Sequence, residues 1–307
     1  MELRFPAHVP LSQLTLGTVQ MGLDYGIANR TGRPEFRQAC EIVAAAYEGG
    51  VRCLDTAASY GVSEEVLGAV LADLALADKV TVVTKVQPIT GDVGGPEAAA
   101  LVEASVTRSL QRLGLERLPV CLMHWEDNFA YIDALLALRD RGLVGHVGCS
   151  VMTPQATQRI LDSGLADALQ IPTNLLDKRF TGPGLIERAA NEGVAVFVRS
   201  IYLQGLVFLP EADIPTELAA VIPVRRELQS IAGDADMAVS ELCMRYALGL
   251  PGVASLVVGV ETVEQMRQNL QVCHRGPLPP ELMERIEQAV PDLPEVVVMP
   301  TLWPQGR

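Results

Sequence analysis

Short apolar runs alternate with longer segments of helical periodicity along almost the whole chain. The runs are typical of buried β-strands, and the segments between them place apolar residues three and four positions apart, as amphipathic helices do. The pattern predicts strands at 11–17, 52–56, 80–86, 120–125, 146–150, 168–171, 194–200 and 255–259. It predicts helices at 35–48, 64–74, 96–113, 131–140, 154–162, 185–191, 224–232, 239–248, 263–272 and 280–289.

Eight short strands, each followed by a helix, match a (β/α)8 TIM barrel in number and order. A doubly wound sheet is the alternative, but the G-x-G-x-x-G pattern that usually follows its first strand is absent. We therefore expect an α/β protein with one barrel domain over residues 1–307 and extra helices near the C-terminus. The Gly-spaced segment 17–26 and the stretch 206–223, which holds three prolines, are expected to be loops.

The composition limits the kinds of partner that the protein can bind. Hydrophobic residues make up 49% of the chain, yet no apolar run approaches the length of a membrane span, and residues 1–10 lack the apolar core of a signal peptide. The expectation is a cytoplasmic protein. The net charge of −13, without a cluster of Lys or Arg, argues against nucleic acid or a membrane as partner. The six cysteines are scattered and form no CxxC pair, so free buried thiols are expected rather than a metal site.

Four polar residues follow strands that lie near one another in a barrel, where the carboxyl ends of the strands form the active face. Asp55 and Tyr60 follow the second strand, Lys85 ends the third and His124 the fourth. A buried ammonium needs a counter-ion, which Asp55 can supply to Lys85. The Lys85 cation in turn favours ionisation of Tyr60, which could then exchange a proton with a carbonyl oxygen, while neutral His124 orients that oxygen. These four residues are called the tetrad below.

Residues close to the tetrad in the sequence allow further predictions. Ser63 is expected to cap the helix that follows Tyr60. Strand alternation predicts that Met123 and Trp125, on either side of His124, point towards the surrounding helices. The walls of a substrate pocket are expected from the loops 20–25, 125–129, 206–216 and 299–303.

The motifs LDTAASYG, VVTK and LMH, in this order, resemble those of the aldo-keto reductase superfamily, which carries an Asp, Tyr, Lys and His tetrad. The resemblance extends over nearly the whole chain, through LTLGTVQMGLDYG, GCS, LQIPTN, RSIYLQG and VGVETVEQMRQNL. It implies reduction of a carbonyl, or oxidation of an alcohol, with NADP(H) or NAD(H) bound in an extended form and without a Rossmann domain. The opening motif is similar to that of a bacterial branch associated with sugar or secondary-metabolite pathways.

The resemblance also implies a set of cofactor-binding residues. They are Gly17, Thr18, Gln20, Ser150, Gln170, Arg199, Ser200, Leu203, Gln204, Gly205, Gly259, Gln265 and Asn269. Three departures from the family's pattern concern the same set. Val151 stands where many relatives have Asn, and Arg199 where many have an aromatic residue. Relatives that bind NADP tightly often place Lys and Arg around the 2′-phosphate, at positions that here are Gly259 and Gln265, with Glu261 between them. The choice between NADP and NAD therefore stays open, as does the role of Arg199, either stacked on the nicotinamide or paired with a carboxylate.

The leading hypothesis is an NAD(P)-dependent oxidoreductase that reduces a small polar aldehyde or ketone, such as a sugar derivative, with Tyr60 as general acid and base. One alternative is a redox-neutral epimerase or isomerase that recycles its bound nicotinamide. Another is a cofactor-binding sensor or interaction subunit without turnover. A barrel hydrolase is the least favoured, because the sequence shows no metal-ligand set and no nucleophile–base pair at a recognisable spacing.

Overall fold

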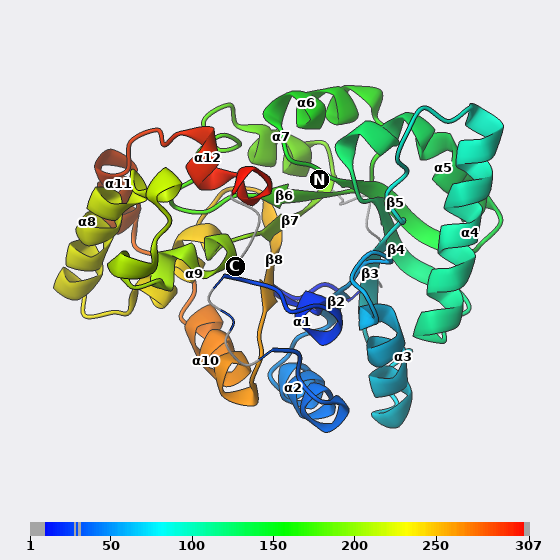
Figure 1. Ribbon diagram of the computed structural model, residues 1–307, viewed down its shortest axis with the longest axis horizontal. Coiled ribbons are helices and arrows are strands. Elements are labelled where there is room, and N and C mark those ends of the chain that lie inside the picture. The colour runs from blue at the N-terminus through cyan, green and yellow to red at the C-terminus, as the bar shows by residue number, and fades with distance from the viewer. Residues whose placement is uncertain (1–9, 28, 30–31, 304–307) are drawn as a thin grey trace.

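The computed structural model describes residues 10–27, 29 and 32–303. The prediction that residues 1–10 lack a signal peptide concerns a segment that lies, except for Pro10, outside the described residues. Eight parallel strands pair in chain order and close between β1 and β8, with helices forming an outer ring (Figure 1). The strands are β1 Leu14–Gly17, β2 Cys53–Asp55, β3 Thr81–Lys85, β4 Leu118–Met123, β5 Val144–Ser150, β6 Ala168–Pro172, β7 Ala195–Arg199 and β8 Val253–Gly259. The predicted (β/α)8 barrel is confirmed, and a doubly wound sheet is excluded by the closure.

The predicted helices are all present. The helices are α1 Val19–Gly22, α2 Phe36–Glu48, α3 Ser63–Asp73, α4 Gly95–Leu113, α5 Ile132–Asp140, α6 Pro154–Ser163, α7 Leu185–Asn191, α8 Val221–Asp234, α9 Val239–Leu248, α10 Val263–His274, α11 Pro280–Ala289 and α12 Glu295–Val298. Two expectations were wrong. The segment 17–26 contains the short helix α1, and the supposed loop 206–223 contains 3-10 turns and the first residues of α8. Single turns of this kind are too short for a periodic pattern to show.

Side chains alternate between the inside and the outside of the barrel, because successive residues of a strand face opposite ways. Cys53 and Val83 belong to the small apolar cluster inside the barrel, whereas Leu54 packs outwards against the helices. Asp55 and Lys85 come two residues after Cys53 and Val83, so the inward series ends with them at the carboxyl ends of β2 and β3. The alternation that builds the core thus also aims the polar residues into the barrel mouth.

Helix ends follow local chemistry in some places and tertiary contacts in others. The Thr153 side chain accepts a hydrogen bond from the backbone N–H of Ala156 and caps α6, which ends at Gly164 in the left-handed region. Ser63, however, does not cap α3. It is the first residue of the helix, and its hydroxyl donates to the backbone oxygen of Thr18 at 2.7 Å, which joins α3 to the loop after β1.

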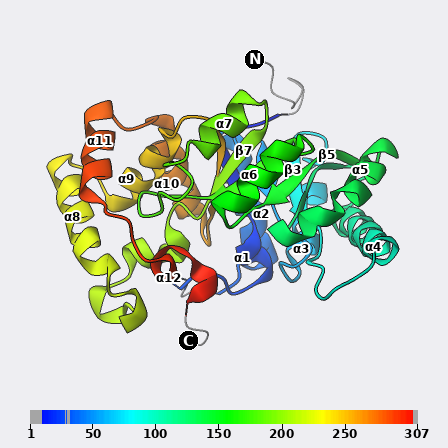
Figure 2. The ribbon, with the colours of Figure 1, turned by 90° about the horizontal axis from the view of Figure 1, so that it is seen from above.

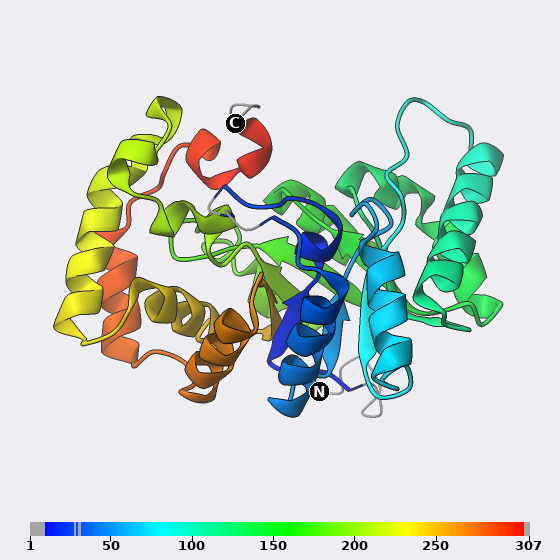
Figure 3. The same cartoon turned by 60° about the horizontal axis from the view of Figure 1, so that its bottom comes forward.

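The C-terminal segment adds to the rim of the barrel. In the views of Figures 2 and 3, α12 (red) lies on the same side of the barrel as α1 (dark blue). Pro300 and Thr301, just after α12, line the cavity described below. None of the described helices is both long and apolar enough to span a membrane. All six cysteines are free thiols, five of them buried.

Candidate active site

A cavity of about 730 Å³ opens at the carboxyl ends of the strands. Three members of the tetrad, Asp55, Tyr60 and His124, line it, and Lys85 lies directly behind Asp55. The wall also contains most of the residues predicted to bind a cofactor. These are Gly17, Gln20, Ser150, Gln170, Arg199, Ser200, Gln204, Gly205, Gly259, Gln265 and Asn269. Side chains from seven of the eight strands and the loops after them therefore meet at one cavity, as the barrel topology predicts.

Asp55 and Lys85 form a buried ion pair. The Lys85 ammonium donates to Oδ1 and Oδ2 of Asp55 at 2.8 and 2.9 Å and to the backbone oxygen of Thr56 at 2.9 Å. Gln170 donates to Oδ1 of Asp55 at 2.7 Å, so the carboxylate is held from two strands. Burial alone lowers the pKa of Lys85, but Asp55 and Tyr60 outweigh it, and the net pKa lies above the usual value. Lys85 is therefore charged at neutral pH.

Tyr60 lies against this cation, with the Lys85 Nζ 5.0 Å from the centre of its ring. Two glycines set the position of its loop. A Cβ on Gly22 would meet the Tyr60 backbone oxygen at 1.8 Å, and a Cβ on Gly61, at φ +56°, would meet the Gly22 backbone oxygen at 2.5 Å. Helix α1 can therefore press on the Tyr60 loop only because both residues lack a side chain. The glycines of GLDYG and SYG thus have a physical role in placing the phenol.

His124 contacts Tyr60 edge to face, with ring centres 5.5 Å apart. Its Nδ1 lies 3.0 Å from the Ser59 hydroxyl, which leaves Nε2 for the cavity. Burial, followed by the charges of Lys85 and Arg199, lowers the pKa of His124 to about 3. The imidazole is therefore neutral over the physiological range, as expected from the sequence.

Arg199 ends β7 and lines the cavity, and its guanidinium donates to the backbone oxygen of Val151 at 3.1 Å and contacts the Met152 sulfur at 2.8 Å. Among the residues that the structure describes, no carboxylate lies within ion-pair distance of it. The interpretation of Arg199 as half of a rim salt bridge is therefore wrong for the described part of the chain. Its charge is directed at the cavity.

The loop after β1 and the end of β8 form one stretch of the cavity wall. Gly17 and Gly259 are paired in the sheet, and a Cβ on Gly259 would meet the Gln20 side-chain amide at 2.4 Å. Gln20 is 7% exposed, and its amide oxygen lines the cavity without a hydrogen-bond partner. A buried acceptor without a donor is unfavourable, and a bound ligand that donates to it would remove that cost. The room left by Gly17 and Gly259 beside the unpaired Gln20 amide oxygen is compatible with a cofactor bound at this position.

Two predicted cofactor residues lie outside the cavity wall. Thr18 is buried and donates its hydroxyl to the backbone oxygen of Asp55 at 2.9 Å, and Leu203 belongs to the apolar core. Trp125 was predicted to face the helices, but it is 48% exposed and lines the cavity. Strand β4 ends at Met123, which does pack outwards, so strand alternation no longer applies two residues later.

Each of the four predicted wall loops contributes to the cavity, through residues such as Tyr25, Trp125, Phe208 and Thr301. Other lining residues were not predicted individually from the sequence. These are Asn29, Met152, Ile201, Tyr202, Ser240 and Gln268. Glu261, noted only as a neighbour of Gln265, lines the cavity as well. Their positions depend on how loops fold over the barrel, which a strand and helix pattern does not encode.

A sequence model of the Aldo/keto reductase family matches residues 13–291, and the chain belongs to this family. The uncharacterized oxidoreductase YqkF of Bacillus subtilis is 25% identical, over 89% of this chain and 94% of that protein. The L-glyceraldehyde 3-phosphate reductase of Escherichia coli O157:H7 is also 25% identical, over 82% of this chain and 83% of the relative. The NADH-specific methylglyoxal reductase of Escherichia coli K12 is 22% identical, over 85% and 90%. Membership of this family supports an oxidoreductase enzyme.

Solved structures share the fold. The holo form of an aldo-keto reductase from Bacillus halodurans superposes with a TM-score of 0.77 at 22% identity, over 95% of this chain and 97% of that one. A glycerol dehydrogenase from Gluconobacter oxydans gives a TM-score of 0.73 at 19% identity, over 99% and 98%. At these identities the likeness establishes the barrel architecture alone.

Proposed function

We propose that this protein is an NAD(P)H-dependent reductase of small polar aldehydes or ketones, with Tyr60 as the group that transfers the proton. The observation that carries the proposal is the arrangement of the tetrad. The Tyr60 phenol lies against a buried, charged lysine and beside a neutral histidine, and the phenol and the imidazole both line one cavity. A neutral carbonyl needs both a hydride and a proton to become an alcohol, and this cluster supplies the proton.

Each member of the tetrad has a distinct task. Asp55 keeps Lys85 protonated and in place, and the Lys85 charge stabilises the tyrosinate that remains after Tyr60 gives its proton to the carbonyl oxygen. Ser59 can donate to Nδ1 of His124, which then carries its proton on Nε2. That N–H donates to the same carbonyl oxygen and orients it towards Tyr60. In the reverse direction tyrosinate accepts the proton of an alcohol.

A bound nicotinamide would supply or accept the hydride. Ser150, the last residue of β5, and Gln170, its partner in β6, are the candidates to hold its amide, and Arg199 ends the next strand, β7. Gln20, Gly17, Gly205 and Gly259 provide room and polar groups along the middle of the cavity. Gln265 and Asn269 are at its far end.

Two features support a small polar substrate. The wall beside His124 combines the aromatic side chains of Trp125 and Tyr25 with the charge of Arg199, so it offers both apolar contact and polar recognition. The similar enzymes from Escherichia coli are named for L-glyceraldehyde 3-phosphate and methylglyoxal, which are compact polar carbonyl compounds.

The test is to incubate the purified protein with NADH or NADPH and a panel of aldehydes and ketones that includes sugars, trioses and methylglyoxal. The expected result is loss of reduced-cofactor absorbance together with formation of the alcohol. Product formed without any net change in that absorbance would instead support a redox-neutral isomerase. Tight cofactor binding with no turnover on any member of the panel would support a sensor.

A further inference from the structure

We infer that the site selects NAD(H) over NADP(H), and that Glu261 is the residue that makes this selection. The inference rests on the proposed function, because it concerns the cofactor of the same cavity. It depends on residues at the end of the cavity remote from the tetrad, called the adenosine end below. Its lining residues are Glu261, Gln265, Gln268, Asn269 and Val272, from the β8–α10 junction and helix α10.

The length of a dinucleotide assigns this end. Hydride transfer requires the nicotinamide to lie beside the carbonyl at Tyr60 and His124. The remaining room in the cavity extends past Gly17 and Gly259 to the start of α10, so the second ribose and the adenine must lie at that end. NAD and NADP differ only there, in a hydroxyl or a phosphate on the 2′ carbon of the adenosine ribose.

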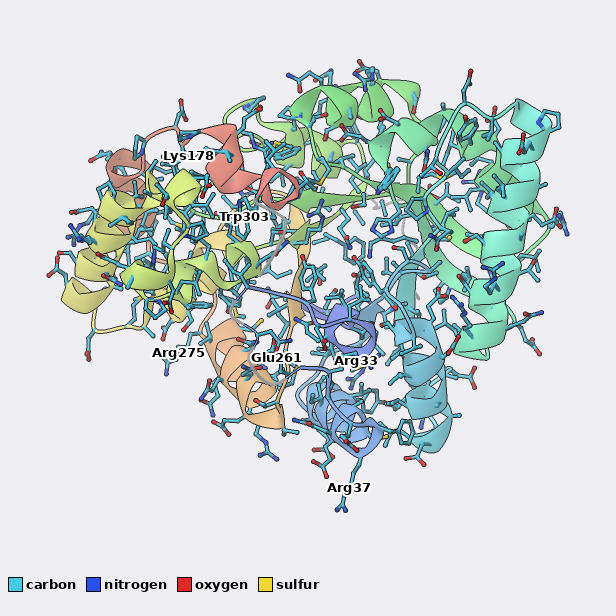
Figure 4. The ribbon with its side chains drawn as sticks, in the orientation of Figure 1. Arg33, Arg37, Lys178, Glu261, Arg275 and Trp303 are labelled. Atoms are coloured by element: carbon cyan, nitrogen blue, oxygen red, sulfur yellow. The ribbon has the colours of Figure 1, made fainter. Side chains whose placement is uncertain are left out.

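Glu261 brings a negative charge to this end. It lies between the end of β8 and α10 (Figure 4), and no described Lys or Arg is within ion-pair distance of its carboxylate. The described charged residues that line the cavity are Asp55, Glu261 and Arg199, and both Asp55 and Arg199 belong to the nicotinamide end. Arg267, the cation nearest in sequence, is exposed and does not line the cavity. A carboxylate can accept from ribose hydroxyls and repels a phosphate.

The backbone around Glu261 is fixed by side chains from two helices. Its N–H donates to Oε1 of Gln265 at 2.7 Å, and its carbonyl oxygen accepts from Nε2 of Gln38 on α2 at 3.0 Å. These contacts involve only main-chain atoms of Glu261. The contacts therefore fix the backbone of Glu261 at the cavity edge, and substitution of its side chain leaves both of them in place.

The start of α10 is also less suited to a phosphate than most helix N-termini, whose free N–H groups bind anions. Here Thr262 and Gln265 form a capping box. The Gln265 N–H donates to the Thr262 hydroxyl, and the N–H groups of Glu261 and Thr262 both donate to Oε1 of Gln265. Three N–H groups at this end are thus already satisfied within the chain, and a 2′-phosphate would have to displace their present acceptors in order to use them.

The experiment measures the dissociation constants of NADH and NADPH by fluorescence titration for the wild type, Glu261→Gln, Glu261→Lys and a control, Glu264→Gln. Glu264 is in the first turn of α10, three residues after Glu261, but does not line the cavity. The wild type is expected to bind NADH at least about tenfold more tightly than NADPH, because one like-charged pair is sufficient for such discrimination. Glu261→Gln should tighten NADPH binding and bring the dissociation constants of NADPH and NADH closer together. Glu261→Lys should make the two constants equal or reverse their order. Glu264→Gln should leave their ratio unchanged.

Salt provides a second readout. The discrimination in the wild type should weaken as ionic strength rises, because salt screens the repulsion, and it should depend less on salt in Glu261→Gln. Equal affinities in the wild type, or an equal shift in the Glu264→Gln control, would overturn this inference and leave the proposed function intact. Binding of neither cofactor would overturn both.

Discussion

The buried Asp55–Lys85 pair makes a quantitative prediction about stability. Asp55→Asn keeps the shape of the side chain but leaves the Lys85 ammonium, 1% exposed, with only neutral oxygen acceptors. Removal of one partner from a buried ion pair typically lowers the free energy of unfolding by about 3–5 kcal/mol. We expect a loss in this range for Asp55→Asn at neutral pH, measured by urea unfolding followed by circular dichroism.

A double-mutant cycle separates the pair from its surroundings. Lys85→Met should also destabilise the protein, because it leaves the Asp55 carboxylate buried with Gln170 as its remaining side-chain donor. The double variant should be less destabilised than the sum of the two single variants by about 2 kcal/mol or more.

The Arg141–Glu103 pair offers a matched control. It has the same 2.8 Å separation, but its side chains are 55% and 49% exposed. Glu103→Gln should therefore change stability by less than about 1 kcal/mol. An effect of Asp55→Asn as small as that of the control, or additivity of the two core substitutions, would refute the assignment of Asp55 as the counter-ion of Lys85.

Three further predictions follow from the site. His124, whose pKa is lowered to about 3, is neutral in the folded protein and becomes charged in the unfolded chain below pH ~6.5, so stability should fall as pH falls. Between pH 6 and pH 4, His124→Gln should lose about 2 kcal/mol less stability than the wild type, and equal losses would contradict a neutral buried histidine. Gly22→Ala would place a Cβ 1.8 Å from the backbone oxygen of Tyr60 and so push the Tyr60 loop aside. It should reduce kcat by about tenfold or more, because small displacements of a catalytic group lower the rate strongly. Gly94→Ala, where a Cβ meets nothing within 4 Å, is its control, and equal kcat values would argue against that role. Arg199→Met should bring the dissociation constants of the oxidised and the reduced cofactor closer together. The oxidised nicotinamide ring is cationic, so a guanidinium beside it favours binding of the neutral reduced form. An unchanged ratio of the two dissociation constants would place Arg199 away from the nicotinamide.

The periodic part of the chain was predictable because burial imposes the same two periods on every barrel of this type. Asp55 and Lys85 could be placed together for the same reason, since each extends an inward-facing series by one step. Thr18, Ser63 and Trp125 could not, because each lies just past the end of a strand or at a helix start, where loop contacts decide the direction of a side chain. The hydroxyl groups of Thr18 and Ser63 hydrogen-bond to each other, and Trp125 lines the cavity because β4 has already ended. Glu261 had no pattern of its own, and its place became visible only with the cavity.

The role of Tyr60 is tested most directly by comparing Tyr60→Phe with Tyr25→Phe, because both tyrosines line the same cavity. Turnover of the best carbonyl substrate and the dissociation constant of the reduced cofactor should be measured for both variants. We predict that Tyr60→Phe lowers kcat by at least about 10²-fold, the usual contribution of a general acid, with little change in cofactor affinity. Tyr25→Phe should retain most of the wild-type kcat. Full turnover in Tyr60→Phe, or an equal loss in both variants, would contradict Tyr60 as the proton donor.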